Sequence, residues 1–158
     1  MCSEFEYNHE IITEQLEIGK PFEKSIEFFE NIIVKEHGIK SIWLGIYLNN
    51  GTIIGEIHFH DIDKLNRSCY IGMRLTKLEY RNKGYGKESL KLLLDYGFYN
   101  YGFERIAATT WESNILAQKS LEKLGFLLEG KERKAIYCGE KKYDKYRYGL
   151  LIEDYREK

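Results

Sequence analysis

The chain has 158 residues, of which 24 are basic and 25 acidic, so its net charge is −1, and 43% of its residues are apolar. The chain therefore lacks the basic excess of proteins that bind nucleic acids or membrane surfaces. Its length and apolar share fit one domain over residues 1–158. There is no apolar run of membrane-spanning length and no signal-peptide layout, so we expect a cytoplasmic protein. The three cysteines form no C-x-x-C pair, so we expect no metal site.

The apolar periodicity predicts alternating helices and strands along the chain. Helices are expected over about residues 21–38, 85–101 and 115–124. Strands are expected over residues 41–48, 52–60, 68–76 and 105–111, and in two or three pieces of 126–151. The fold class is therefore α/β, a single domain with a mixed central β-sheet flanked by helices. The sheet should be antiparallel at the hairpins and parallel where helices cross over.

One glycine-rich turn lies between the strand over 68–76 and the strongly periodic helix that follows. Its residues are Arg81, Asn82, Lys83, Gly84, Tyr85, Gly86 and Lys87. The two glycines let backbone N–H groups turn toward one point at a helix N-terminus, which carries a partial positive charge, and three cations surround that point. The sequence therefore predicts that residues 81–87 form a cradle for a phosphorylated ligand.

Spacing separates the motifs that could give such a cradle. A P-loop requires Ser or Thr after Gly86-Lys87, where this chain has Glu88. A dinucleotide fingerprint requires a third glycine, where this chain has Ser89. The pattern that fits at every position is [RQ]-x-x-G-x-[GA] at a strand-to-helix turn.

That pattern, together with Asn114-x-x-Ala117 and Lys123-Leu124-Gly125-Phe126 downstream, resembles the GNAT N-acetyltransferase superfamily from about residue 8 to 155. The branch it resembles most contains ribosomal-protein N-terminal and spermidine acetyltransferases. The resemblance implies acetyl-CoA as co-substrate, with its pyrophosphate in the cradle. The pantetheine arm would run along the strand edge at Arg74, Leu75 and Thr76, with Asn114 on its other side. Asn114 also reads as a plain helix cap.

Direct attack by an amine requires a neutral amine, and therefore a base, because alkylamines are protonated at pH 7. Glu56 is the candidate base, since it shares a strand face with His58 and His60. His58 is the alternative base because its ordinary pKa lies near working pH. The competing interpretation of all three is an ordinary solvated strand face.

The chain departs from the family where many members carry a tyrosine near the departing sulfur. In this chain that position holds Leu121. At the position where some ribosomal-protein acetylating members carry a serine, this chain has Ala117. Tyr143 is the candidate acid, with Tyr137 and Tyr146 as alternatives, or the thiolate leaves without an acid.

As a second departure, we expect the first strand of the fold to be absent, which would leave a sheet edge for another subunit to cover and favours a homodimer. We expect an acceptor that is a primary amine of a small molecule, such as a polyamine or amino sugar, or of a protein N-terminus. The alternative is a catalytically inactive acyl-CoA-binding protein with a regulatory role.

Overall fold

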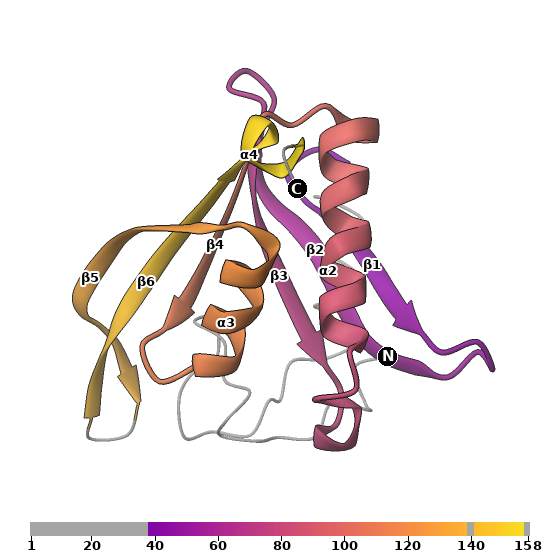
Figure 1. The fold of residues 1–158 in the computed structure, drawn as a ribbon, viewed down its shortest axis with the longest axis horizontal. Coiled ribbons are helices and arrows are strands. Elements are labelled where there is room, and N and C mark those ends of the chain that lie inside the picture. The colour runs from indigo at the N-terminus through magenta and orange to yellow at the C-terminus, as the bar shows by residue number, and fades with distance from the viewer. Residues whose placement is uncertain (1–37, 139–140, 157–158) are drawn as a thin grey trace.

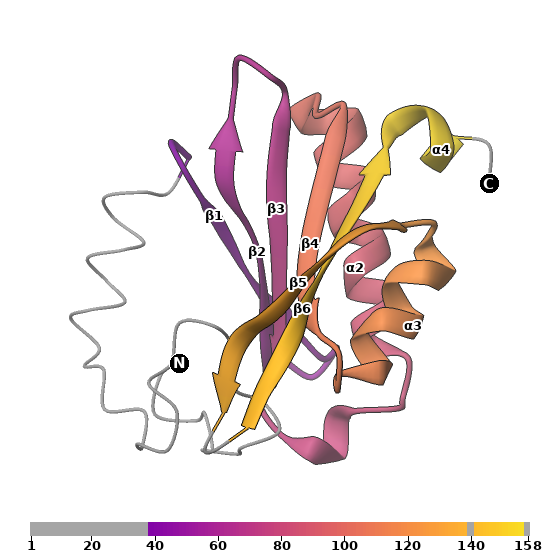
Figure 2. The ribbon, with the colours of Figure 1, turned by 90° about the vertical axis from the view of Figure 1, so that its left-hand side faces the viewer.

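The computed structural model describes residues 38–138 and 141–156. They form a six-stranded sheet in the order β1-β2-β3-β4-β6-β5, with helices α2 and α3 on one face (Figures 1 and 2). The strands are β1 Ile42–Tyr47, β2 Ile53–Asp63, β3 Ser68–Leu75, β4 Arg105–Trp111, β5 Leu127–Cys138 and β6 Lys141–Leu151. The helices are η3 Leu78–Tyr80, α2 Tyr85–Asp95, its continuation η4 Tyr96–Tyr101, α3 Ile115–Leu124 and α4 Ile152–Arg156. Of the helix predicted over 21–38, residues 21–37 lie outside the described residues.

The sheet is mixed, as predicted. β1–β2, β2–β3, β4–β6 and β5–β6 pair antiparallel, whereas β3 and β4 pair parallel and are joined by the α2 crossover. The tail forms two strands, and its interrupted sequence pattern has a structural cause. The β5–β6 register shifts between Glu132 and Ile136, where Lys134 takes a φ of 54°. A bulge therefore separates the two apolar pieces of one strand.

The hairpin between β1 and β2 turns where the sequence predicted it, with Gly51 at a φ of 85°. Strict alternation along β2 predicts that Ile54 shares a face with Glu56 and His58, and this prediction is wrong, because Ile54 is 1% exposed and lies in the core. The β1–β2 register shifts between Ile46 and Tyr47, so β2 carries one extra residue at this point. A strand with an extra residue changes the face on which its next side chain lies.

The core lies between the sheet and helices α2 and α3. The stripe predicted for α2 is confirmed by its buried side chains, Leu90, Leu93, Leu94 and Phe98. The last turns of this helix are π-helical, which the sequence did not predict, and Gly102 ends them at a φ of 81°. Cys69 is 2% exposed, as expected for a small buried apolar side chain. No helix within residues 38–138 and 141–156 is long and apolar enough to cross a membrane.

The parallel strands β3 and β4 part along most of their length. Their pairing covers only Ser68–Tyr70 of β3 against Arg105–Ala107 of β4. β3 nevertheless continues to Leu75 and β4 to Trp111. The sheet therefore opens in a V whose apex is at Tyr70 and Ala107 and whose wide end faces the start of α2 (Figure 1).

Candidate active site

The cradle at the wide end of the V is made mostly by backbone. Asn82 and Gly84 take left-handed φ angles of 59° and 89°, and Gly84 is the residue before the first turn of α2. Left-handed residues in a turn redirect the backbone N–H groups beside them, and the first N–H groups of a helix have no partner within it. A Cβ on Gly86 would lie 3.0 Å from Met73 Cε, so glycine also lets the helix start close to β3.

The strand edge beside the V is set by the alternation of β3. Thr76 donates its backbone N–H (2.8 Å) and its hydroxyl (3.1 Å) to the carbonyl of Ile54, so both groups of this residue point to β2. In an antiparallel pair the next residue in the strand points its backbone groups the other way. The N–H and C=O of Leu75 and Met73 therefore face the V, and only the backbone of this edge is oriented to pair with an extended ligand.

Asn114 lies at the end of β4, on the opposite side of the V from β3. Its Oδ1 accepts from the backbone N–H of Ala117 at 3.2 Å, which makes Asn114 the N-cap of α3. The cap interpretation is therefore confirmed. The capping contact uses Oδ1, and the amide Nδ2 remains chemically able to donate to a ligand.

The sheet face opposite α2 carries the candidate base. Glu56 on β2 lies directly across from Arg74 on β3. Burial raises the pKa of Glu56, and the nearby Arg74 guanidinium opposes that shift. Burial lowers the pKa of Arg74, and Glu56 opposes that shift in turn. A half-buried carboxylate with a raised pKa is a better proton acceptor near neutral pH than a solvated one, so Glu56 is suited to act as a base.

His58 is poorly suited to that role. Its ring stacks on Trp43, with 3.8 Å between ring centroids, and a Cβ added to Gly72 would lie 2.4 Å from its Nε2. Burial, with smaller contributions from His60 and Arg74, lowers the pKa of His58 to about 3. Among the residues that the structure describes, its buried Nδ1 has no hydrogen-bond partner. His58 therefore stays neutral over the physiological range, and its ring binds an additional proton only weakly.

The candidate acid Tyr143 is half-buried on β6, with its ring 6.2 Å from that of Trp111. Extending the β3–β4 register brings Trp111 level with Arg74, so Tyr143 and Glu56 lie at the same end of the sheet on opposite sides of the V. Leu121 is a core residue, 6% exposed. The neighbouring residue Ser120 carries a hydroxyl, but this hydroxyl donates to the carbonyl of Leu116 in the same helix at 2.8 Å.

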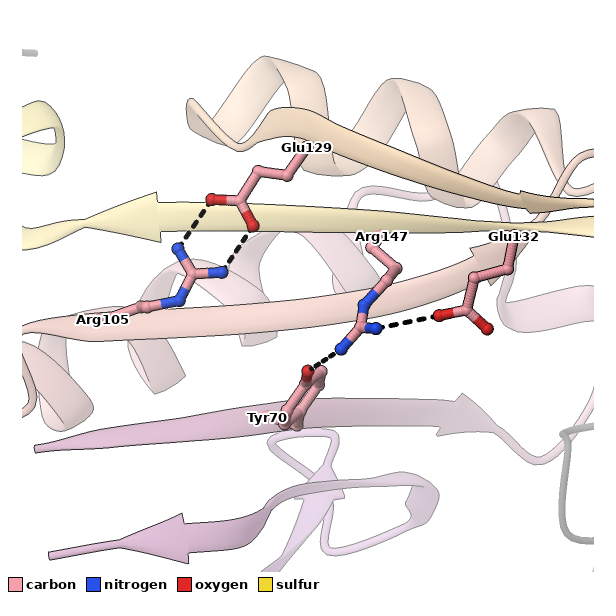
Figure 3. Close-up of polar contacts among 5 residues, drawn as sticks. All are labelled: Tyr70, Arg105, Glu129, Glu132 and Arg147. Carbon is pink, nitrogen blue, oxygen red and sulfur yellow. Dashed lines mark hydrogen bonds and ion pairs between the residues drawn. The ribbon is translucent and has the colours of Figure 1, made fainter. Parts of the chain in front are cut away.

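A pocket of about 310 Å³ lies at the apex of the V, and we call it the apical pocket. It is lined by Tyr70, Arg105, Ala107, Glu129, Arg147 and Tyr148. Side chains from four strands converge on it (Figure 3). Sequence reasoning missed this site, although Tyr70 lies two and four residues before Gly72 and Arg74 and so shares their strand face.

Two ion pairs organise the apical pocket. Arg105 donates from both terminal nitrogens to the two carboxylate oxygens of Glu129, at 2.6 and 2.5 Å. Arg147 donates to Glu132 at 3.0 Å and to the hydroxyl of Tyr70 at 2.8 Å. The hydrogen bond from Arg105 lowers the pKa of Glu129, which keeps this carboxylate ionised.

The donor set fits coenzyme A at the wide end of the V. The cradle offers backbone N–H groups and the cations Arg81, Lys83 and Lys87 to a pyrophosphate, and a Cβ at Gly84 would meet nothing within 4 Å, so the space before it is open. The outward N–H and C=O of Leu75 and Met73 offer strand-like pairing to amide groups. Among the residues that the structure describes, no cluster of three or more His, Cys, Asp or Glu side chains could hold a metal ion.

The comparisons with known proteins agree with this geometry. Residues 5–127 match the family model described as an acetyltransferase (GNAT) domain. The chain is 31% identical over 108 residues to the Bacillus subtilis protein named "Putative ribosomal N-acetyltransferase YdaF". That alignment covers 68% of this chain and 58% of the relative. It is 33% identical to the uncharacterized N-acetyltransferase YjdG of the same species, over 70% of this chain and 66% of the relative.

Solved structures show the same fold. One titled "Crystal structure of Probable acetyltransferase" is 30% identical with a TM-score of 0.67, covering 73% of this chain and 64% of that chain. Spermidine N-acetyltransferase from Vibrio cholerae in complex with CoA and spermine is 21% identical with a TM-score of 0.78. That alignment covers 84% of this chain and 79% of that chain, and at this identity it supports the fold alone.

Proposed function

The chain belongs to the GNAT acetyltransferase family, and we propose that it transfers the acetyl group of acetyl-CoA to a primary amine by direct attack. The observation that carries the proposal is the combination of the V between β3 and β4 with the cradle at its wide end. A strand edge with outward N–H and C=O groups runs from the apex of the V to an anion-binding helix start. This arrangement suits a ligand with an amide-containing arm and a pyrophosphate.

The cradle and the strand edge would hold the co-substrate. When bound, acetyl-CoA supplies a thioester whose carbonyl carbon accepts the amine. The N–H groups of residues 82–87 and the cations of the cradle would bind its pyrophosphate. Asn114 Nδ2 would donate to the pantetheine arm from the β4 side. The outward N–H of Leu75 or Met73 would donate to the thioester oxygen and stabilise the negative charge that grows there.

The amine must lose a proton to react, and Glu56 would accept it. A protonated alkylamine has a pKa well above 7, so a base of raised pKa at the site increases the reactive fraction. Arg74, directly across from Glu56, limits how far burial raises that pKa. His58 stacks beside this pair as a neutral ring.

The departing thiolate would receive its proton from Tyr143 or from solvent. Tyr143 lies on the sheet face that carries Glu56 and at the same end of the sheet. Leu121, at the family's usual tyrosine position, has no acidic group. A thiol pKa near 8.5 makes the thiolate a good leaving group, so the absence of a dedicated acid at residue 121 does not prevent transfer.

Thiol release from acetyl-CoA tests the proposal. The chain should release free thiol when an accepted amine from a panel of polyamines, amino sugars, aminoglycosides and peptide N-termini is present. Binding of coenzyme A without thiol release across the panel would instead favour a regulatory acyl-CoA-binding protein. Failure to bind coenzyme A at all would remove both interpretations.

A further inference from the structure

The apical pocket is built for more than the packing of strands. Its lining includes the small residue Ala107, and Gly149 lies beside Ala107 in the β4–β6 pair. A Cβ on Gly149 would lie 2.2 Å from Glu129 Oε1 and 2.6 Å from Arg105 Nη1. Glycine here lets the Arg105–Glu129 pair lie flat across the sheet, which leaves room above it for a ligand.

The two arginines of the pocket differ in how firmly they are held. Arg105 uses both terminal nitrogens in its bidentate pair with Glu129. Arg147 makes a single bond to Glu132, and its other terminal nitrogen donates to the hydroxyl of Tyr70. The Arg147 and Glu132 side chains are 50% and 39% exposed, and a single ion pair at that exposure stabilises little. Arg147 can therefore exchange Glu132 for a ligand anion that offers two oxygens.

The pocket lies on the same sheet face as the candidate base. Tyr70 and Arg74 are four residues apart on β3, and at about 3.3 Å per residue this separates them by about 13 Å. Glu56 pairs with Arg74 and His60 pairs with Tyr70, so the same spacing applies on β2. The rings of His60 and Tyr70 stack with 5.6 Å between centroids at the pocket end of this face.

We propose that the apical pocket is a specificity subsite for the acceptor, in which Arg147 binds a carboxylate or phosphate at the end of the sheet face that lies about 13 Å along the strands from the Glu56–Arg74 pair. This inference rests on the proposed acetyl transfer. It defines the acceptor as a primary amine that also carries an anionic group. Polyamines do not fit, because Glu129 and Glu132 are already paired and two guanidinium groups would face the additional ammonium groups.

Equilibrium binding tests the subsite without relying on turnover. Two matched pairs of ligands are titrated calorimetrically against the protein in the presence of coenzyme A, which has no acetyl group to transfer. The first pair is glycyl-glycyl-glutamate amide and its glutamine counterpart, and the second is glucosamine 6-phosphate and glucosamine. We expect the acidic member of at least one pair to bind about tenfold tighter, as one charge-assisted hydrogen bond allows. The pair that shows this preference identifies the anion as carboxylate or phosphate.

Variants assign the preference to Arg147. Arg147→Gln should bring the ratio of the two affinities close to one, whereas Arg147→Lys should restore part of the preference. Arg133→Gln is the matched control, since Arg133 is an exposed arginine of β5 outside the pocket lining. Tyr70→Phe, which removes the hydroxyl that orients Arg147, should reduce the preference without abolishing it, and it provides a second variant if Arg147→Gln fails to fold.

Two results would overturn the subsite: equal binding of both members of both pairs by the wild-type chain, or an unchanged preference in Arg147→Gln. The proposed function fails separately. If the acidic ligand binds through Arg147 but no amine in the panel gives thiol release, the subsite stands and acetyl transfer does not. If amines are acetylated without regard to an anionic group, acetyl transfer stands and the subsite does not.

Discussion

The cradle and the opposite sheet face, which together would hold donor and acceptor, are built in different ways. The cradle is seven consecutive residues whose ligand groups are mostly backbone N–H groups, set by two left-handed residues and a helix start. The sheet face is a set of side chains from several strands, held by cross-strand register, by ring stacking and by the ion pairs that Figure 3 shows. A backbone site should be sensitive to conformation, whereas a side-chain site should be sensitive to charge and pH.

The largest effect should follow from removing the candidate base. We expect Glu56→Gln to lower turnover at pH 7 by about a hundredfold, the low end of the usual contribution of a general base. The loss should shrink toward alkaline pH, because more of the amine is then neutral without help. Rates of thiol release measured from pH 6 to pH 10 would show this.

The control for that variant is His60→Gln, which changes a titratable side chain on the same strand face two positions beyond His58. It should leave the shape of the pH profile intact. If Glu56→Gln lowers the rate by the same factor at every pH, Glu56 is not the base, and solvent would have to take that role.

The second effect tests the backbone character of the cradle. Gly84→Asp should weaken coenzyme A binding by about thirtyfold, or about 2 kcal/mol, because a non-glycine residue is strained at a φ of 89° and the new carboxylate would face the pyrophosphate. Gly102→Asp is the matched control, since Gly102 is also left-handed, with a φ of 81°, at the far end of the same helical segment. Calorimetric affinities that fall equally in both variants would show strain alone, with no role for the cradle.

The same contrast explains what the sequence could and could not predict. The cradle was predictable because its glycine spacing, its cations and the following apolar stripe are neighbours in the chain, and local rules apply to them. The Asn114 cap and the Gly125 stop of α3 were predictable for the same reason. The strands were found by alternation, but the single long β5 was not, because the bulge between Glu132 and Ile136 breaks the period.

The apical pocket lay beyond the reach of such rules. Arg147 and Tyr70 are 77 residues apart in the chain, and their contact depends on β6 lying between β4 and β5 in the sheet. No local pattern specifies that order. Likewise, His58 was an acceptable base by sequence, and only the stacking of Trp43 and the close approach of Gly72 show why its pKa is depressed.

A third effect should appear in the pH dependence of stability. The pKa of His58 is about 3 in the folded chain and about 6.5 when unfolded, so between these values the unfolded state binds more protons. Stability therefore falls as pH is lowered through this window, and His58 should remove about 2 kcal/mol between pH 6.5 and pH 5.

Urea unfolding at pH 7 and pH 5 measures this contribution. His58→Gln should lose less stability than the wild-type chain over that interval, because glutamine does not titrate. His60→Gln serves as the control, since His60 is partly exposed and pairs with Asp61 at 3.0 Å. An identical pH dependence in wild type and His58→Gln would mean that the buried stack opens readily enough for His58 to be protonated in the folded state.

The smallest effect on stability should carry the clearest information about the pocket. In Gly149→Ala the new methyl group would displace the ends of Glu129 and Arg105, which are flexible and partly exposed, so the free energy of unfolding should change by no more than about 1 kcal/mol. Because the methyl group would displace the Arg105–Glu129 pair that lines the apical pocket, the preference for anionic ligands should nevertheless be lost. Gly130→Ala on β5 is the matched control, since a Cβ there would meet nothing within 4 Å.

Stability that is unchanged in both variants, with ligand preference lost only in Gly149→Ala, would separate a ligand site from a structural ion pair. A preference retained in Gly149→Ala would mean that the ligand does not lie over the Arg105–Glu129 pair.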